Sequence, residues 1–239
     1  MIKNISNLGD SAIYCDFGSE VNETINANVI DYFNHLTFLI KEKKIQGINN
    51  LTPSYNKLII SFDLSLINFS KLKKIIENLD IIKDIKKTYK KVKIPICCDD
   101  SYGLDFERLS NKLNLTKDEI LSLFFNKEYF CYMTGFIAGM PFVGDINKKI
   151  RIDRLGTPRV KVPKGSIGIT EQFANIYTYE SPGGWNIIGN TPKKIFEKLN
   201  IEDPALIKPG DKISFYQISK EEYLKFNDWY LLWNIATRY

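Results

Sequence analysis

The sequence predicts an α+β protein in which helices packed on a β-sheet, residues 1–88, precede a β-rich domain, residues 89–239. Helical and strand periodicities alternate in the first part of the chain, as in a layer of helices on a sheet. From Gly135 onward, short β-prone runs alternate with turn residues, and nine of the fourteen glycines lie between Gly135 and Gly189. Many short strands with glycine and proline between them favour a β-barrel or a sandwich.

The first domain is predicted to have the element order β-α-β-β-α-β. Asn22, followed by Glu23 and Thr24, is a suitable start for the first helix. The expected elements are a strand at 12–17, a helix at 22–40, strands at 45–52 and 57–62, a helix at 69–79 and a strand at 92–97. Two helices on one face of an antiparallel sheet form a ferredoxin-like layer.

The second domain follows the charged stretch 83–93, which marks the boundary region. Two short helices are expected at 104–113 and 117–125. Thr116 is the predicted N-cap of the second helix, and Glu119 completes a capping box. The β-prone runs then lie at 159–162, 166–169, 175–179, 185–188 and 212–215.

Composition excludes several classes of protein. The net charge of +5 is mild and the lysines are spread along the chain, which indicates a solvated surface and not a nucleic-acid interface. No apolar run approaches the roughly 20 residues that cross a bilayer. Residues 1–9 lack the features of a signal peptide, so we expect a soluble, cytoplasmic protein.

The cysteines and the single histidine limit the chemistry further. The four cysteines are irregularly spaced without a CxxC pair, which predicts structural thiols and no zinc or redox site; they are Cys15, Cys97, Cys98 and Cys131. His35 lies in the first helical pattern and has a predicted structural role. A Ser-His-Asp triad or a histidine metal cluster therefore cannot form elsewhere in the chain.

Arginine is scarce, and three of the five arginines fall within nine residues: Arg151, Arg154 and Arg159. A planar, bidentate donor is useful in that segment in a way that lysine cannot supply. Either a functional anion site or a structural ion pair explains the clustering.

Two glycine- and proline-rich segments supply candidate binding residues. Segment 135–144 includes Gly139 and Pro141, matches neither a P-loop nor a dinucleotide-binding pattern, and is either a pocket lining or a barrel turn. In segment 157–166, Arg159 and Lys161 alternate with valines, so both cations are predicted on one strand face. With Lys164 and Ser166 after a proline turn, this face is either a carboxylate or phosphate site or an exposed amphipathic strand.

Two further segments complete the candidate site. Segment 180–185 contains Glu180, which can act as a general base or a polar anchor, and Ser181, Gly183, Gly184 and Trp185, with Gln172 and Tyr177 upstream. The two adjacent glycines expose backbone N–H groups that can form an anion-binding nest. Segment 189–192 adds the hydrogen-bonding side chains of Asn190 and Thr191. The occurrence of all four segments within about sixty residues is the functional signal.

Together these segments, GFIAGMPFVGD, TPRVKVPKGSIGI and ESPGGWNIIGNTP, resemble one family over nearly the whole chain. That family includes the B-type subunit of 5-oxoprolinase, Kip-type kinase inhibitors, allophanate hydrolase subunit 1 and part of the urea carboxylase carboxyltransferase domain. The chain departs from the family pattern at Asn190, where relatives carry arginine, and at Phe124, where relatives commonly carry histidine.

The resemblance implies a ferredoxin-like N-terminal domain, 1–88, and a cyclophilin-like β-barrel domain, 89–239. It implies the B-type subunit of an ATP-dependent 5-oxoprolinase that opens 5-oxoproline (pyroglutamate) to L-glutamate, with ATP bound as its Mg complex. The implied partners are a paralogous, cyclophilin-like C-type subunit and a separate A-type subunit of another fold.

On this basis the predicted catalytic residues are Arg159, Lys161 and Glu180. The predicted substrate- or nucleotide-binding residues are Gly139, Pro141, Lys164, Ser166, Gln172, Tyr177, Ser181, Gly183, Gly184, Trp185, Asn190 and Thr191, and no metal ligands are expected. Two alternative functions stay open: a histidine-kinase inhibitor, and a component of an allophanate- or urea-related amide hydrolase or carboxyltransferase.

Overall fold

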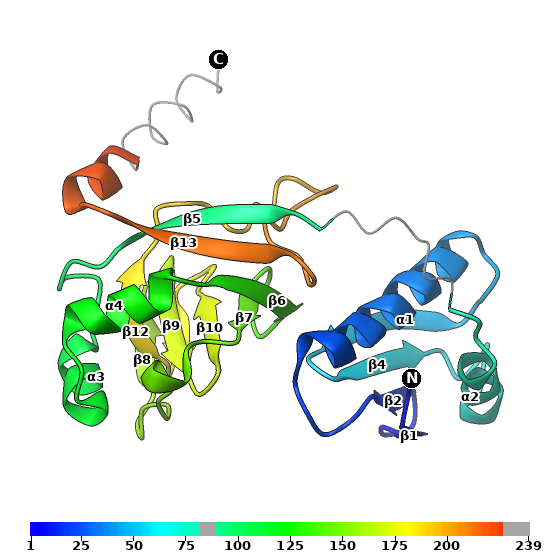
Figure 1. The fold of residues 1–239 in the computed structure, drawn as a ribbon. Helices are drawn as coiled ribbons and strands as arrows, with labels where there is room; N and C mark the ends of the chain where they lie inside the picture. Colours follow the sequence, from blue (N-terminus) through cyan, green and yellow to red (C-terminus); the bar gives the residue numbers. More distant parts are fainter. Residues whose placement is uncertain (82–88, 227–239) are drawn as a thin grey trace, which may run out of the picture. The chain divides into compact units, whose positions relative to one another are not determined.

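The computed structural model describes residues 1–81 and 89–226 of the chain. By its internal contacts the chain divides into two compact units, Met1–Thr88 and Tyr89–Tyr239 (Figure 1). Each unit has its own hydrophobic core.

The N-terminal unit is a four-stranded antiparallel sheet with two helices. Its elements are β1 (Asn4–Asn7), β2 (Ala12–Asp16), α1 (Glu23–Lys41), β3 (Ile48–Ser54), β4 (Lys57–Phe62) and α2 (Phe69–Glu77), and the strand order is β1-β2-β4-β3. As predicted, Asn22 is the N-cap of α1, where its side chain accepts a hydrogen bond from Ile25 N at 2.9 Å.

One face of this sheet is buried under both helices. The buried residues of β2 and β4 alternate along each strand and form one apolar cluster with residues from both helices, among them Ile13, Cys15, Leu58, Ile60, Val29, Leu36, Leu72 and Ile76. A sheet with one buried face reads as an alternating pattern, which is why β2 and β4 were predictable from sequence.

The prediction that strand 92–97 closes the N-terminal sheet is wrong. This segment is β5 (Lys91–Cys97), which belongs to the barrel of the second unit and pairs in parallel with β13 (Lys212–Ile218). The place beside β2 is taken by β1, which pairs with β2 as an antiparallel hairpin. Strand propensity identifies a strand but not its partner, and β1 is a short, polar strand without an apolar signature.

The C-terminal unit is built around a closed seven-stranded barrel (Figure 1). Its remaining strands are β6 (Glu128–Thr134), β7 (Pro141–Gly144), β9 (Ser166–Thr170), β10 (Phe173–Ile176) and β12 (Asn186–Asn190). The order around the barrel is β10-β7-β6-β13-β5-β12-β9. A separate two-stranded sheet pairs β8 (Arg159–Val162) with β11 (Ser181–Gly183).

Two α-helices and a 3₁₀ turn accompany the barrel: α3 (Phe106–Leu113), α4 (Lys117–Phe125) and η1 (Lys148–Ile150). The predicted capping box at the start of α4 is confirmed, because Thr116 and Glu119 exchange both hydrogen bonds. At its other end α4 inserts the ring of Phe124 into the barrel core, 5.0 Å from the ring of Phe215 and 5.2 Å from that of Tyr129.

The cysteines and His35 have the predicted structural positions. All four thiols are free and buried, and His35 is buried in α1. Burial raises the pKa of Cys15 to about 12, and burial together with the adjacent Cys97 raises the pKa of Cys98 to about 12.

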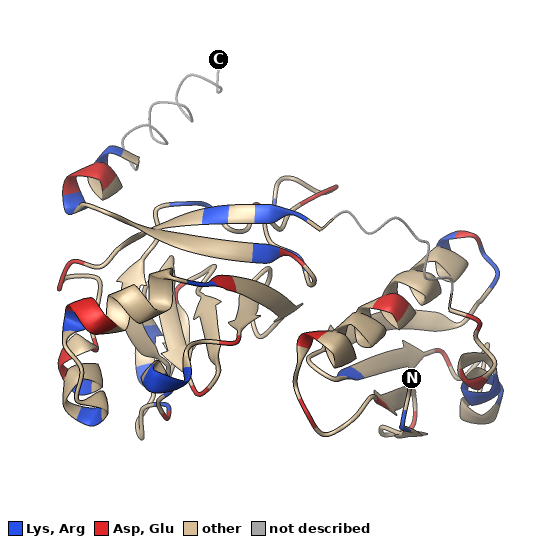
Figure 2. Cartoon of the chain, in the orientation of Figure 1, with Lys and Arg blue, Asp and Glu red and all other residues tan. Residues whose placement is uncertain are grey.

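The charge distribution and the helices of the described residues both bear on whether this chain can span a membrane. Basic and acidic residues are interspersed on the elements of both units (Figure 2). Among residues 1–81 and 89–226, no helix is long and apolar enough to cross a bilayer.

We predict that the native protein resists thiol alkylation. At a pKa of about 12, Cys15 and Cys98 are ionised about three-thousandfold less than a free thiol with a pKa near 8.5, and the thiolate is the reactive form. Iodoacetamide at pH 8, followed by mass spectrometry, should leave native protein unmodified and label all four cysteines after unfolding in guanidinium. Rapid labelling of a native thiol would contradict the buried positions.

Candidate functional site

A buried carboxylate at the start of α3 fixes the orientation of Arg159. Asp105 is 5% exposed, and its Oδ2 accepts a hydrogen bond from Ile187 N at 2.6 Å. Its Oδ1 accepts one from Arg159 Nη2, also at 2.6 Å. Because both oxygens have partners elsewhere, Asp105 does not cap its own helix with its side chain.

The other amino nitrogen of this guanidinium makes no hydrogen bond to the described residues. Arg159 Nη1 is buried and has no hydrogen-bond partner within the described part of the chain. A buried donor without an acceptor is costly, and such groups are rare in folded proteins unless a ligand or water satisfies them.

The strand that faces Arg159 brings further polar groups beside it. Gly183 of β11 lies opposite Arg159 of β8, and Ser181 lies opposite Val162. Like Arg159 Nη1, the Ser181 Oγ is buried without a partner among the described residues. A Cβ atom added to Gly183 would lie 2.1 Å from the Tyr177 hydroxyl, so glycine is required here to admit the phenol.

Tyr177 lies in a positively charged environment. Burial raises the pKa of its phenol, while a side-chain hydrogen bond with Asn175 and the charges of Arg154 and Arg159 oppose this rise. The net effect is a raised pKa, so the phenol keeps its proton at neutral pH and can donate a hydrogen bond.

Arg154 is the second guanidinium of this region. A Cβ atom added to Gly184 would lie 3.2 Å from Arg154 Nη2, so the guanidinium lies directly against this backbone. Gly183 and Gly184 therefore make room for Tyr177 and Arg154. The sequence predicted only that their backbone N–H groups form an anion-binding nest. We call Arg154, Arg159, Tyr177 and Ser181, with Gly183 and Gly184, the arginine site.

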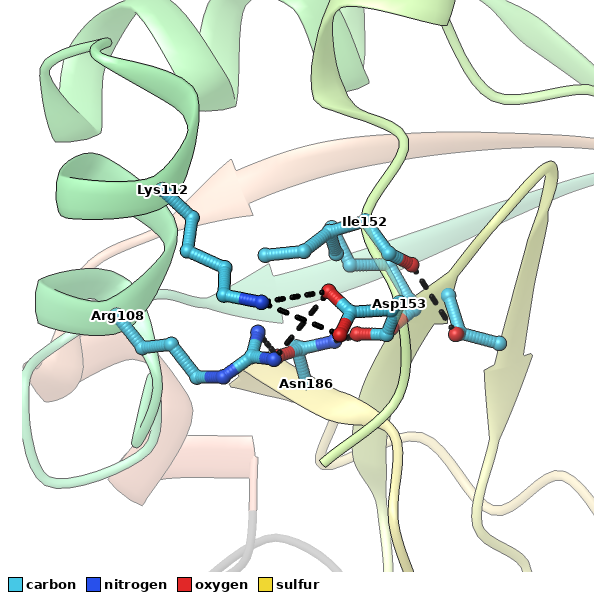
Figure 3. Close-up of polar contacts among 7 residues, drawn as sticks. Arg108, Lys112, Ile152, Asp153 and Asn186 are labelled. Atoms are coloured by element: carbon cyan, nitrogen blue, oxygen red, sulfur yellow. Dashed lines mark hydrogen bonds and ion pairs between the residues drawn. The ribbon is translucent and has the colours of Figure 1, made fainter. Parts of the chain in front are cut away.

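The segment that carries Arg154 is anchored on both sides. Leu155 N donates to Gly184 O at 2.7 Å, and Asn186 Nδ2 donates to Asp153 O at 3.0 Å. Figure 3 shows that Asp153 and Asn186 are in turn bound from α3: Arg108 donates to Asn186 Oδ1 at 2.7 Å, and Lys112 contacts the Asp153 carboxylate at 3.0 Å. The only sequence signal for Arg154 was the clustering of arginines.

A second group of predicted residues surrounds the turn between β8 and β9. Asn190 Nδ2 donates to Lys164 O at 2.8 Å and to Ser166 Oγ at 3.5 Å, and Asn190 Oδ1 accepts from the Tyr223 hydroxyl at 2.9 Å. Thr191 N donates to Gly165 O at 2.9 Å. Asn190 and Ser166 are buried, so their polar groups stabilise the turn.

The side chain of Lys164 points away from these buried amides. Its ammonium lies 5.9 Å from the centre of the Tyr179 ring, which contacts the Phe196 ring. Gly139 lies against the same Phe196 ring. The loop of Gly139 is held to this region by the hydrogen bond from Thr178 Oγ1 to Ala138 O at 2.7 Å.

The predicted convergence of Arg159 and Lys161 on one site is wrong. Arg159 turns inward to Asp105, whereas the side chain of Lys161 is 76% exposed and pairs with Glu180 at 3.1 Å. The side chain of Glu180 is 56% exposed, so this pair lies in solvent, away from the buried donors. The β8–β11 pair lies outside the barrel sheet, and the simple alternation of buried and exposed residues does not hold along β8.

Three other predicted residues lie apart from the arginine site or at its margin. Gln172 is in the turn between β9 and β10, whereas Tyr177 follows the other end of β10. The Trp185 ring contacts the Phe142 ring at 5.5 Å in β7, the strand that Pro141 begins.

Neither departure from the family pattern removes a group from the arginine site. Phe124 is fully buried among aromatic rings of the barrel core, and Asn190 is bound in the β8–β9 turn. Among the residues that the structure describes, no three His, Cys, Asp or Glu side chains form a metal-binding group.

We predict that Asp105→Asn lowers the free energy of unfolding by about 3 kcal/mol, because removing one partner of a buried ion pair leaves the other charge uncompensated. Asp153→Asn is the matched control: the Asp153 side chain is 64% exposed, and exposed pairs contribute about 0–1 kcal/mol. Urea unfolding of the second unit measures both. Equal effects would show that the Asp105–Arg159 pair does not determine stability here.

Comparison with known proteins identifies the family of the chain. Residues 3–207 match the family model of the carboxyltransferase domain, subdomain C and D. The chain is 30% identical over 236 residues to the B-type subunit of 5-oxoprolinase from Bacillus subtilis, a match that covers 94% of this chain and 96% of that protein. It is 31% identical over 174 residues to the same subunit from Haemophilus influenzae, covering 72% of this chain and 76% of the relative.

Solved structures agree on the fold. The structure of TTHA0988 has a TM-score of 0.76 and 25% identity, and the match covers 87% of this chain but only 40% of that protein. The Kluyveromyces lactis urea amidolyase has a TM-score of 0.76 and 22% identity, covering 92% of this chain and 15% of the enzyme. These neighbours confirm the predicted cyclophilin-like barrel of the C-terminal unit. The chain belongs to the family of carboxyltransferase domains, subdomain C and D, and is similar to the B-type subunit of 5-oxoprolinase over nearly its whole length.

Proposed function

We propose that this chain is the B-type subunit of an ATP-dependent 5-oxoprolinase, which opens the lactam of 5-oxoproline to L-glutamate. The observation that carries the proposal is the buried Arg159 Nη1, which has no partner among the described residues, in a protein that is 30% identical to a 5-oxoprolinase component over 94% of its length. A fixed donor at a buried position is suited to an oxygen that carries or develops negative charge.

The chemistry requires activation of an unreactive amide. ATP, as its Mg complex, would transfer its γ-phosphoryl group to the lactam oxygen and leave as ADP, which makes the amide carbon electrophilic. Attack by water on that carbon, with loss of phosphate and cleavage of the ring C–N bond, would then give glutamate. In this scheme Arg159 and the Tyr177 hydroxyl bind the negatively charged end of the substrate, which positions its lactam oxygen for phosphoryl transfer. Their fixed positions avoid reorganisation during the reaction.

Lys164 and Lys194 are the residues that would contact the phosphates. Burial and the nearby charge of Lys164 lower the pKa of Lys194, whose ammonium is paired with Glu197. The positive charge of Lys164 has no such partner among the described residues, which supports a nucleotide position beside Lys164.

The partners in this proposal are a paralogous C-type subunit and a separate A-type subunit. The bacterial relatives are named as components of a larger enzyme, and in the urea amidolyase of K. lactis a region similar to this chain is joined to other segments of one long chain. The second candidate function is a component of a urea-related amide hydrolase or carboxyltransferase, favoured by 22% identity to the urea amidolyase of Saccharomyces cerevisiae over 92% of this chain.

Reconstitution tests the proposal. The chain is combined with its A-type and C-type partner subunits, and glutamate release from 5-oxoproline is measured with and without ATP. ATP-dependent release supports the 5-oxoprolinase function. Release from urea or allophanate, and none from 5-oxoproline, would favour the second function.

We predict that Arg159→Ala and Arg159→Lys each lower kcat/KM by about 100-fold or more, the size expected for one preorganised donor. The lysine variant keeps a positive charge for Asp105 but lacks the planar guanidinium with its two NH₂ groups. A loss of activity in this variant is therefore not explained by a loss of the ion pair that stabilises the fold. Lys148→Ala, at an exposed position of η1, should change kcat/KM less than about twofold. Equal losses in the Arg159 and Lys148 variants would contradict a role for Arg159.

A further inference from the structure

We propose that Arg154 is a second anion-binding residue of the arginine site: with Arg159 Nη1 and the Tyr177 hydroxyl, it binds the carboxylate of the substrate. The identification of that substrate as a lactam carboxylic acid rests on the proposed function. The binding of a small carboxylate by these three groups rests on the structure alone.

The first argument is free hydrogen-bonding capacity. Arg154 is exposed and its guanidinium lies against Gly184, but it has no hydrogen bond or ion pair to an acceptor within residues 1–81 and 89–226. Arg159 uses Nη2 for Asp105 and keeps Nη1 without a partner in the same ranges. Two planar guanidinium groups with free N–H donors match the two oxygens of a carboxylate.

The second argument is the charge of the site. The Tyr177 hydroxyl lies against Gly183, which is opposite Arg159, and the Arg154 guanidinium lies against the next residue, Gly184. The two charges and the hydroxyl therefore share one environment. Asp105 compensates one of the two positive charges. The nearest acidic residue in sequence to Arg154 is Asp153, which pairs with Arg108 and Lys112 instead. One positive charge is left over, which suits a monoanion.

The third argument is preorganisation. Asp153, before Arg154, accepts a hydrogen bond from Asn186 through its backbone carbonyl. Leu155, after Arg154, donates its backbone N–H to Gly184 O. The backbone of Arg154 is therefore fixed before a ligand arrives, and little backbone entropy is lost on binding.

The consequence is specificity for lactams that carry a carboxylate. A site built to pair with a carboxylate discriminates strongly against an analogue that lacks the group, because its polar groups are then left without partners. The pair 5-oxoproline and 2-pyrrolidinone differs only by this carboxylate.

The experiment uses Arg154→Gln and, as the matched control, Lys149→Gln, which removes the same charge at an exposed position five residues away. In the reconstituted complex, Arg154→Gln should raise KM for 5-oxoproline about tenfold or more with a smaller change in kcat, since a charge-assisted hydrogen bond is worth about a factor of ten. Any turnover of 2-pyrrolidinone should be unchanged by the substitution. Lys149→Gln should match the wild type. A KM unchanged in Arg154→Gln would overturn the proposal.

A direct binding measurement separates this inference from the proposed function. Calorimetric titration of the full chain with 5-oxoproline, acetate, 2-pyrrolidinone and inorganic phosphate should show carboxylate binding that is lost in Arg154→Gln. If the complex releases no glutamate but carboxylate binding depends on Arg154, the proposed function fails and the inference stands. Binding of phosphate alone, or carboxylate binding that persists in Arg154→Gln, would overturn the inference.

Discussion

The ion pair between Asp105 and Arg159 is the constraint on which the rest of the candidate site depends. Through one carboxylate it joins three elements: the start of α3, the backbone of β12 and the side chain of β8. The β8–β11 pair is not part of the barrel sheet, so this buried contact fixes the inward direction of Arg159. A charge in so buried a place is stable only when it is paired and hydrogen-bonded, and Asp105 satisfies both conditions.

A second contact from the same helix extends this constraint. Asp105 accepts a hydrogen bond from the backbone N–H of Ile187. Arg108, three residues after Asp105, binds the side chain of the preceding residue, Asn186. The start of α3 thus holds two successive residues of β12, and Asn186 passes the restraint to the segment of Arg154. The exposed contact of Lys112 with Asp153 adds little free energy, since solvent screens it.

Most of the regular elements could be predicted from the sequence, and the exceptions have physical reasons. The bounds of β4, β8 and α4 agree with the prediction because alternation, helical spacing and a capping box mark them. Strand β6 follows α4 with only two residues between them, so its apolar run could not be separated from that of the helix. Strand β11 consists of Ser-Pro-Gly and forms because β8 pairs with it, which no local propensity indicates.

The candidate site was predictable in part. The sequence identified Arg159, Tyr177, Ser181 and the two glycines, because turn residues and hydrogen-bonding groups gather in those segments. It could not identify Asp105, which lies 54 residues before Arg159 in the chain and carries no local signal. Nor could it separate Lys161 from Arg159, because the direction of each side chain is set by long-range partners.

The parallel pairing of β5 with β13 has a consequence for how the protein is made. These strands come from the two ends of the second unit, and their register joins Lys91 to Lys212 and Cys97 to Ile218. During synthesis, the barrel cannot close until the ribosome has added the last of these residues, whereas every strand of the first unit's sheet is available once Phe62 has emerged. The first unit can therefore fold while the chain is still growing, and the second must wait until Ile218 has been added.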